Sequence, residues 1–464
     1  LAEAFEPYNV ELVTARGAAG QAADFKGAPL EPGAAFSMML SVGDFTMGSI
    51  GTVTYRKERR ILGFGHPFMG IGPLEAPICS AYIHDVYPLI SASYKIGTPG
   101  PIVGSSLQDR TFSVSGVLGK QPRLIPVEAE VTDRSTGRRK TFRSQVVAHP
   151  NLSSALISSA VATGVAEIRG TPGAAFARIA TSVQADEVGS IERTNTVFDA
   201  RSIDSAATAD LDEMLSILAN NPFYPVAVKS ARVKVEIESG RPTAQIERVY
   251  VREGRLEPGQ SVEVGVVIKP YKQPAVTRTV TVQVPPSAAD GTYTLLVRGG
   301  APPASLAFGG LIIRPSAPQD PQQAPPANVR QMIQRLLERE RGTEIVVRLW
   351  LPTTAVTAEG QRMAGLPAPL DAIMRSTKSS GVRLDRDEVR VIEPTDWVVS
   401  GTQTLTINVR KRDNREIGAA AGDPGGPPPQ PPSAGGRLEV QARSEEHTSE
   451  LQSQFHLVCR LLLE

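Results

Sequence analysis

One histidine stands out as a residue whose type and surroundings could carry out chemistry. His66 follows a short β pattern in RILGFGHPFMGIG and is flanked by Gly63, Gly65, Pro67 and Gly70. Glycines on both sides let the backbone turn sharply or approach a ligand, so we expect the imidazole at the end of a strand rather than in a core. Such an imidazole can take the proton of a weak nucleophile. A lone histidine is also compatible with a structural role, so the surrounding pattern has to decide.

Asp109 is the acidic residue that could act as the partner of His66. It lies in Gln108-Asp109-Arg110, close enough in the sequence to belong to the same β domain. The alternative is a solvated or turn-capping pair with Arg110 at the start of a strand. Asp85 follows His84 in YIHDVYP, but neighbours on a strand point to opposite faces, so we do not expect these two to act together.

No hydroxyl or thiol has the surroundings of an activated nucleophile. Ser49 in MGSIG and Ser115 in SVSGV lie near glycines, without a nucleophile-elbow pattern. Cys79 has no basic neighbour that would stabilise a thiolate, so we predict a small core residue. The sequence therefore predicts a general base, His66, without its nucleophile.

Short strands bounded by turn residues must position His66. Between about 34 and 150 they predict a small β barrel or sandwich, with a hairpin turn at STGRR that uses Gly137. Two helices are expected after it, at 152–165 and 205–219. The candidate N-caps of the first are Asn151 and Ser153, and Asn221-Pro222 ends the second.

A second β domain is predicted from residue 228. Val233, Val235 and Ile237 alternate with charged residues, as in a strand with one wet face. Further strands at 243–252, 261–269, 276–284 and 292–298, with turns at Glu257-Pro258-Gly259 and Ala289-Asp290-Gly291, indicate an immunoglobulin-like sandwich. We interpret it as a spacer or interaction module, since it has no catalytic constellation.

A third, small α+β unit is expected after a Pro/Gln-rich linker. It would open with a helix at 328–341, capped by Asn328 and ended by Gly342. A strand at 344–351, a helix near 368–376 and strands at 388–393 and 403–410 follow. The expected divisions are a β domain with helical and strand extensions at 1–227, the sandwich at 228–314, the linker at 315–326, the α+β domain at 327–412, a disordered Pro/Gly-rich tail at 413–442 and a non-native segment at 443–464.

Composition excludes several classes of function. The chain has 49 basic and 48 acidic residues and a net charge of +1, so no nucleic-acid or anionic-membrane footprint is expected. No apolar run is long enough for a transmembrane segment, and no cofactor or metal site is expected. RSEEHTSELQS resembles a translated sequencing adapter, so Cys459, His447 and His456 are set aside as an expected assembly artefact. The chain starts at Leu1, so no signal peptide can be read.

Three stretches around His66 resemble the SpoIVB-type serine peptidase domain of bacterial envelope proteins. They are IGTVTY at 50–55, ILGFGHP at 61–67 and SYKIGTPGPIVGSSLQDRTFSVSGVLGK at 93–120. The downstream sandwich and helix-led unit are similar to the C-terminal regions of the long envelope members. The resemblance implies that His66 is the general base of a serine site, that the protein is extracytoplasmic and that the substrate is a protein or peptide.

The family's serine lies in a GMSGSP-like box that does not occur here. In similar envelope relatives the box precedes the histidine, so residue 1 would fall after it. We therefore expect a fragment of an exported serine endopeptidase that is inactive by itself, of unknown oligomeric state. The alternative is a non-catalytic envelope scaffold that binds proteins or peptides, with a PDZ-like element at LEPGAAFSMMLSVGDF as a weaker possibility.

Overall fold

The computed structural model of this chain describes residues 27–88, 93–252, 255–301, 306–308, 311–313, 326–358, 361–363 and 382–411. Strands dominate these residues, so the prediction of a mainly β fold is confirmed. The helix expected near 368–376, the tail at 413–442, the segment at 443–464 and all but the last residue of the linker at 315–326 lie outside the described residues.

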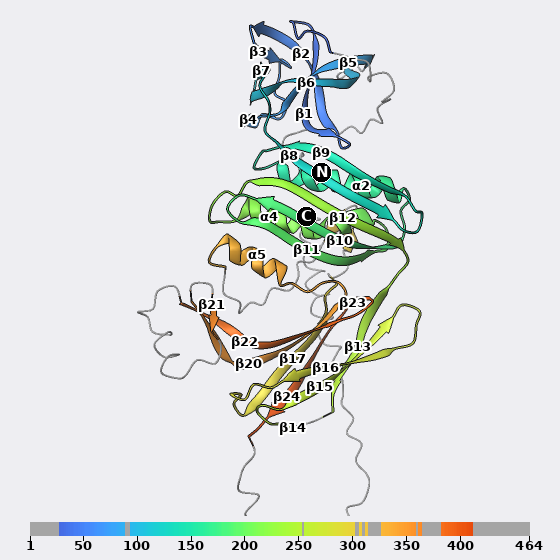
Figure 1. Ribbon diagram of the computed structural model, residues 1–464, viewed down its shortest axis with the longest axis vertical. Helices are drawn as coiled ribbons and strands as arrows, with labels where there is room; N and C mark the ends of the chain where they lie inside the picture. Colours follow the sequence, from blue (N-terminus) through green and yellow to red (C-terminus); the bar gives the residue numbers. More distant parts are fainter. Residues whose placement is uncertain are drawn as a thin grey trace, which may run out of the picture. The chain divides into compact units, whose positions relative to one another are not determined.

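Six antiparallel strands close into a small barrel, drawn in blue in Figure 1. The order around the barrel is β1-β2-β3-β7-β6-β5, and β5 pairs back with β1. A short strand, β4 (Gly72–Pro73), pairs with β6. The barrel strands are β1 (Ala35–Gly43), β2 (Met47–Lys57), β3 (Arg60–Gly63), β5 (Pro77–Tyr87), β6 (Tyr94–Arg110) and β7 (Ser113–Leu118).

Glycines inside the barrel make room for its few large core side chains. A Cβ on Gly63 would lie 2.3 Å from Phe36 Cε1, and a Cβ on Gly116 would lie 2.1 Å from Ile78 Cδ1. Phe36 and Ile78 are both buried and belong to the same cluster. A barrel of six strands has little interior volume, so large side chains on one strand require glycine on the strand opposite.

A second group of strands is continuous with the barrel through the end of β1. Ser41–Gly43 of β1 pair with residues 144–146 of β9, and the order then continues β9-β8-β12-β10-β11. Only the β12–β8 pair in this group is parallel. The strands, drawn in cyan to green in Figure 1, are β8 (Leu124–Asp133), β9 (Arg139–Val147), β10 (Ala175–Ala185), β11 (Gly189–Asp199) and β12 (Val228–Ser239).

This pairing changes the expected domain boundary at 228. Val233, Val235 and Ile237 are buried and alternate as predicted, but they belong to β12, which lies between β8 and β10. Alternation indicates that one face of a strand is covered and does not identify the neighbouring strands. The expected hairpin turn is confirmed, because Gly137 has φ 73° and donates its N–H to the Asp133 carbonyl.

The helices cover the apolar face of this sheet. They are α2 (Ser153–Arg169), α3 (Ile203–Ala207) and α4 (Ala209–Asn220), and their buried side chains share one core with β8 to β12. The expected N-cap of α2 is wrong: the N-cap is Leu152, and Ser153 Oγ bonds instead to the carbonyls of Val147 and His149. α4 ends before Asn221, as predicted. No helix in the described ranges is both long and apolar enough to span a membrane.

The remaining strands enclose one separate core in two sheets. One sheet has the order β16-β15-β13-β23, and the other has β14-β24-β17-β20-β21, with β22 paired to β20. Tyr293 is fully buried and donates its hydroxyl to the Ala289 carbonyl at 2.8 Å, a tyrosine corner typical of immunoglobulin-like sandwiches. The strands are β13 (Thr243–Val251), β14 (Arg255–Leu256), β15 (Ser261–Pro270), β16 (Val276–Gln283), β17 (Gly291–Gly299), β20 (Glu344–Ala358), β21 (Gln361–Met363), β22 (Val382–Pro394), β23 (Val398–Ser400) and β24 (Thr402–Val409), with a further hairpin of β18 (Leu306–Phe308) and β19 (Leu311–Ile313).

The expected separate α+β domain at 327–412 is therefore wrong. Its strands complete the sandwich core, where Ile345, Val347 and Ile407 join Val264 and Leu295. Its helix, α5 (Val329–Leu337), contributes to the core of α2 to α4 instead and lies beside α4 (Figure 1). A Pro-rich linker in the sequence suggests a boundary, but the apolar faces on either side of it decide which core each element joins.

The sequence did predict the start of α5. Asn328 is the N-cap, and its Oδ1 accepts the Gln331 N–H at 2.8 Å. The helix ends at Leu337, however, five residues before the predicted stop at Gly342. Arg193 of β11 is buried there and donates to the carbonyls of Leu336, Arg339 and Glu340 at 3.0–3.1 Å. Leu336 is in the last turn of α5, whereas Arg339 and Glu340 follow it, so Arg193 stabilises the chain where the helix ends.

Candidate functional site

The loop after β3 carries His66 in an unusual backbone conformation. Phe64 and Gly65 have φ angles of 71° and 75°, and Gly70 and Gly72 have φ angles of 71° and 81°. The glycines adopt this left-handed region without cost, which is consistent with the sharp turn expected around His66. Phe64 does so at a cost of about 1–2 kcal/mol, which surrounding contacts must offset. Strained backbone of this kind is concentrated at functional sites, so the loop is a candidate site.

Asp109 holds this loop from the end of β6. Its carboxylate is completely buried and accepts the N–H groups of Phe68 at 2.8 Å and of Met69 and Gly70 at 2.7 Å. The Ile71 N–H lies farther away, at 3.4 Å. A charged acceptor that collects several amides fixes the backbone that presents them. Asp109 is thus the anchor of the loop that begins with His66.

This arrangement agrees with the turn-capping part of the alternative for Asp109, but not with a solvated pair or with a direct contact to His66. The solvated pair with Arg110 is wrong, because Asp109 is buried and Arg110 Nε donates to Gln108 Oε1 at 2.9 Å. Every hydrogen bond that the described residues give to the carboxylate comes from a backbone amide of the loop, and none from the His66 ring. Asp109 is therefore connected to His66 through the main chain.

His66 itself is exposed, and one of its ring nitrogens contacts the main chain. Its Nδ1 lies 2.7 Å from the Pro67 carbonyl oxygen. A carbonyl oxygen can only accept a hydrogen bond, so Nδ1 carries the proton and Nε2 of the neutral ring is free to accept one. The Phe64 ring packs edge-to-face on the imidazole, with 5.6 Å between centroids. The ring is oriented by its neighbours and presents a basic nitrogen to solvent.

Aromatic rings support the loop from the barrel. Phe64 contacts Phe36 edge-to-face, with centroids 5.1 Å apart, and lies 5.9 Å from Phe68. Gly51 of β2 makes room for this arrangement, because a Cβ there would lie 2.9 Å from Phe64 Cγ and Cδ2. Close packing against the Phe64 ring thus explains why the IGTVTY stretch has a glycine at position 51.

We expect Gly51→Ala to destabilise the loop by about 1–3 kcal/mol, because the added methyl group forces Phe64 away from Phe36. The measurement is amide hydrogen exchange at 64–70, which should accelerate. Ser49→Ala on the same strand is the control and should change stability by less than about 0.5 kcal/mol. Unchanged exchange in the Gly51 variant would contradict this account of the packing.

The other candidates from the sequence lie elsewhere. Ser49 pairs with Met38, and Ser115 pairs with Leu62 and Gln108; within the described part of the chain no hydroxyl or thiol is hydrogen-bonded to His66. Cys79 is a buried core residue, as predicted, and burial raises the pKa of its thiol to about 11.

His84 and Asp85 do not form a pair within the chain. His84 Nε2 lies 2.7 Å from Thr98 Oγ1, and Asp85 Oδ1 accepts the Val86 N–H at 2.8 Å. His149 lies between β9 and α2, outside the loop of His66, and burial lowers the pKa of its ring. The described residues contain no group of three potential metal ligands.

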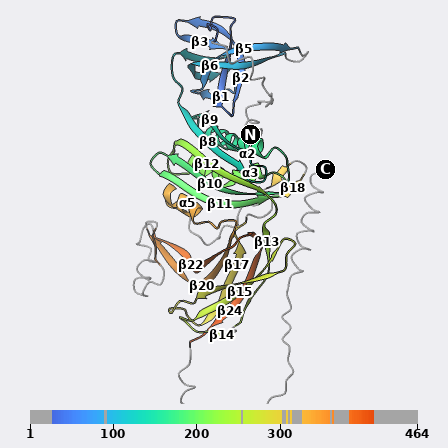
Figure 2. The same ribbon diagram turned by 45° about the vertical axis from the view of Figure 1, so that its right-hand side comes forward.

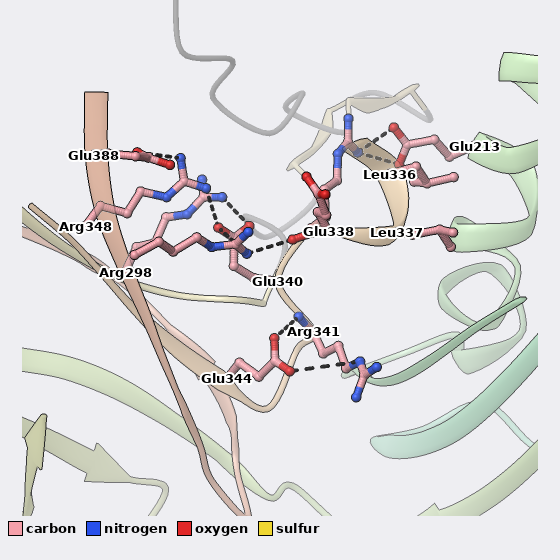
Figure 3. Close-up of polar contacts among 12 residues, drawn as sticks. Glu213, Arg298, Leu336, Leu337, Glu338, Glu340, Arg341, Glu344, Arg348 and Glu388 are labelled. Carbon is pink, nitrogen blue, oxygen red and sulfur yellow. Dashed lines mark hydrogen bonds and ion pairs between the residues drawn. The ribbon is translucent and has the colours of Figure 1, made fainter. Parts of the chain in front are cut away.

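A buried carboxylate that the sequence analysis missed lies just after α5. Glu340 is surrounded by Arg298, Arg348 and Arg390 from β17, β20 and β22 (Figure 3). Arg348 lies 2.6 Å and Arg390 3.5 Å from Glu340 Oε1, while Arg298 bonds to Oε2. Arg348 and Arg390 are directly opposite each other in the sheet, so the negative charge of Glu340, which lies close to both, reduces the repulsion between them.

This cluster is structural rather than catalytic. Burial raises the pKa of Glu340, but the charges of Arg298 and Arg348 and the hydrogen bonds to the carboxylate outweigh burial and lower the pKa to about 2. Its oxygens are occupied by guanidinium groups and cannot act as a base. The available signal in the sequence was Arg348, a charged residue within the apolar strand EIVVRLWL.

Neither a scan of protein-family models nor a comparison with curated proteins finds a match to this chain. The loop at 64–72 and its anchor therefore have to be interpreted from their own geometry.

Proposed function

We propose that this chain carries the general-base half of a serine endopeptidase site, with His66 as the base. The observation that carries the proposal is the contact between His66 Nδ1 and the Pro67 carbonyl. A serine peptidase needs an imidazole whose Nδ1 proton is held by an acceptor and whose Nε2 can take the serine proton. Here a main-chain carbonyl provides the acceptor that a carboxylate provides in the Ser-His-Asp arrangement.

The resemblance of the stretches around His66 to SpoIVB-type peptidases supports the same role. In this proposal Asp109 is a positioning residue, because it holds the amides that follow His66 rather than the ring. The nucleophilic serine is supplied by sequence outside the described residues. The 464-residue chain alone then hydrolyses no peptide, and the intact protein acts outside the cytoplasm on protein or peptide substrates.

The test starts from the reading frame that encodes this chain. If it encodes a GMSGSP-like box, the protein should react with a fluorophosphonate probe, and His66→Ala should slow labelling by about 10²–10⁴-fold, the usual contribution of a general base. His84→Ala is the matched control and should label at the wild-type rate, since His84 contacts Thr98 rather than the loop. Labelling of the His66 variant at the wild-type rate would remove His66 from the mechanism.

The second candidate is a non-catalytic envelope scaffold. The exposed strand edges of the β5–β6 hairpin favour it, because such edges can accept another strand. A complete reading frame without a serine box, together with no labelling of the full protein, would favour this candidate and reject the peptidase.

A further inference from the structure

The β5–β6 hairpin extends beyond the barrel that it helps to close. β5 pairs with β1 only through Ile78–Ser80, and β6 pairs with β7 only from Gly104 onward. Residues 81–87 and 94–102 therefore form a two-stranded ribbon, which leaves the barrel in Figure 2. In the described part of the chain, no third strand pairs with this ribbon. The ribbon contacts β2 through Lys95, which bonds to Thr52, and through Gly97, which lies against Ile50. Within the described residues its β5 edge has no neighbouring strand there, and a third or fourth strand stabilises a two-stranded ribbon.

One face of this ribbon is aromatic and exposed. Tyr82, Asp85 and Tyr87 pair with Thr98, Ile96 and Tyr94 of β6, so these six side chains lie on the same face. The Tyr87 and Tyr94 rings stack, with centroids 5.3 Å apart. The exposed apolar residues on this face are Tyr82, Tyr87, Tyr94 and Ile96, each 39–49% accessible to solvent. Four exposed apolar side chains on two adjacent strands indicate a surface that contacts another protein segment.

A β-bulge gives this strand an internal symmetry. The register of β5 shifts between Ile83 and Asp85, so that His84 is the extra residue. In a regular strand Tyr82 and Tyr87 would point to opposite faces, because they are five residues apart. The bulge brings them to one face and leaves Ile83 and Val86 on the other. The sequence Tyr-Ile-His-Asp-Val-Tyr at 82–87 is thus symmetric about its centre: the residues of each outer pair, Tyr82 with Tyr87 and Ile83 with Val86, have similar side chains and lie on the same face.

We infer that the β5 edge of this ribbon binds the same edge of a second copy of this chain. A two-fold axis through the bulge places His84 beside Asp85 of the second copy, Ile83 beside Val86, and Tyr82 beside Tyr87, each contact occurring twice. The Ile83–Val86 and Tyr82–Tyr87 contacts are apolar, and the His84–Asp85 contact pairs an imidazole with a carboxylate. His84 uses Nε2 for Thr98, so Nδ1 remains for the partner carboxylate. The product is a four-stranded antiparallel sheet with one continuous aromatic face.

Among the described residues, no strand pairs with the β5 edge at 81–87. The Val86 N–H has a local acceptor, Asp85 Oδ1 at 2.8 Å, which a neighbouring carbonyl can replace when Asp85 turns to His84 of the second copy. Six residues on each side make a small interface, so we expect a weak dimer seen at high protein concentration. This inference does not depend on the peptidase proposal.

Sedimentation equilibrium of the full chain tests the inference. We expect the wild type to dimerise, and Asp85→Lys to weaken the dimer by about tenfold, because two attractive cross-strand contacts become unfavourable. The double variant His84→Glu/Asp85→Lys restores opposite charges and should return to the wild-type affinity. Glu263→Lys, exposed on β15, controls for net charge. A monomer up to millimolar concentration, or a dimer that Asp85→Lys does not weaken, would overturn the inference.

Cross-linking checks the register. In a Cys459→Ser background, Tyr82→Cys/Tyr87→Cys should form a disulfide-linked dimer on oxidation. Neither single variant should, because the same residue in the two copies is separated by about 14 Å. Equal cross-linking of a single variant would contradict the two-fold axis through the bulge. A monomer in which amides 81–87 resist hydrogen exchange would indicate that another segment of the chain covers the edge, and would also overturn the inference.

Discussion

Glu340→Gln is expected to lower the free energy of unfolding of the sandwich by about 3–5 kcal/mol. Glu340 is 8% exposed and is the carboxylate that Arg298, Arg348 and Arg390 share. The amide removes the negative charge and turns a donor toward guanidinium groups that are themselves donors. Removing one partner of a buried charge cluster leaves the others uncompensated, which accounts for the size of the effect.

Tryptophan fluorescence can measure this change selectively. The chain has two tryptophans, Trp350 in β20 and Trp397 before β23, and both belong to the sandwich. Their denaturant transition should move to lower concentration in the variant. Glu388→Gln is the matched control, because Glu388 contacts Arg348 only at 3.7 Å and should cost less than about 1 kcal/mol. Equal transitions in the Glu340 and Glu388 variants would contradict a central role for Glu340.

The same residue predicts how stability depends on pH. The pKa of Glu340 falls from 4.5 to about 2 in the folded protein. A lowered carboxyl pKa stabilises the fold at pH values above 4.5, and this contribution is lost as the pH falls from 4.5 toward 2. It amounts to about 3 kcal/mol, which agrees with the estimate for the variant. Between pH 4.5 and 2 the wild type should therefore lose stability more steeply than Glu340→Gln, and parallel curves would contradict the assignment.

Asp109→Asn is expected to release the loop that carries His66, at a cost of about 2–4 kcal/mol. The carboxylate accepts three short bonds from Phe68, Met69 and Gly70, and hydrogen bonds to charged groups contribute more than neutral ones. An asparagine has one oxygen and directs its NH₂ group at the remaining amides. Because those amides are buried or half-buried, their lost partners are not fully replaced by water.

Amide exchange at 68–70 measures the release directly. It should accelerate by about 10²-fold, the equivalent of roughly 3 kcal/mol. Tryptophan fluorescence should stay close to that of the wild type, since both tryptophans belong to the sandwich. Asp290→Asn is the control: Asp290 is exposed and accepts a single amide, that of Lys411. Amides 68–70 that stay protected in the Asp109 variant would show that the aromatic contacts alone hold the loop.

Local patterns predicted much of the secondary structure. The cap of α5 at Asn328, the turn at Gly137 and the alternation of Val233, Val235 and Ile237 were all readable, because each depends on residues within a few positions. The ends of helices were predicted less reliably. Gly342 was predicted to end α5, but the helix ends at Leu337, where Arg193 from a distant strand donates to the Leu336 carbonyl.

The candidate site likewise was only partly predictable from the sequence. His66 could be identified from its glycines, but the role of Asp109 could not, because the bonds to Phe68, Met69 and Gly70 join residues about 40 positions apart. Cys79 was predicted correctly as core, since burial of a small apolar residue needs no particular partner.

The sequence by itself determined where most strands and helices begin, that the fold is mainly β and that His66 lies in a glycine-rich, exposed turn. Only the tertiary structure decided which core each strand joins, that Asp109 holds the His66 loop through its amides, and that Glu340 forms ion pairs with three arginines. The physical reason is that propensity and periodicity act over neighbouring residues, whereas strand pairing and charge neutralisation depend on groups that folding brings together from distant positions.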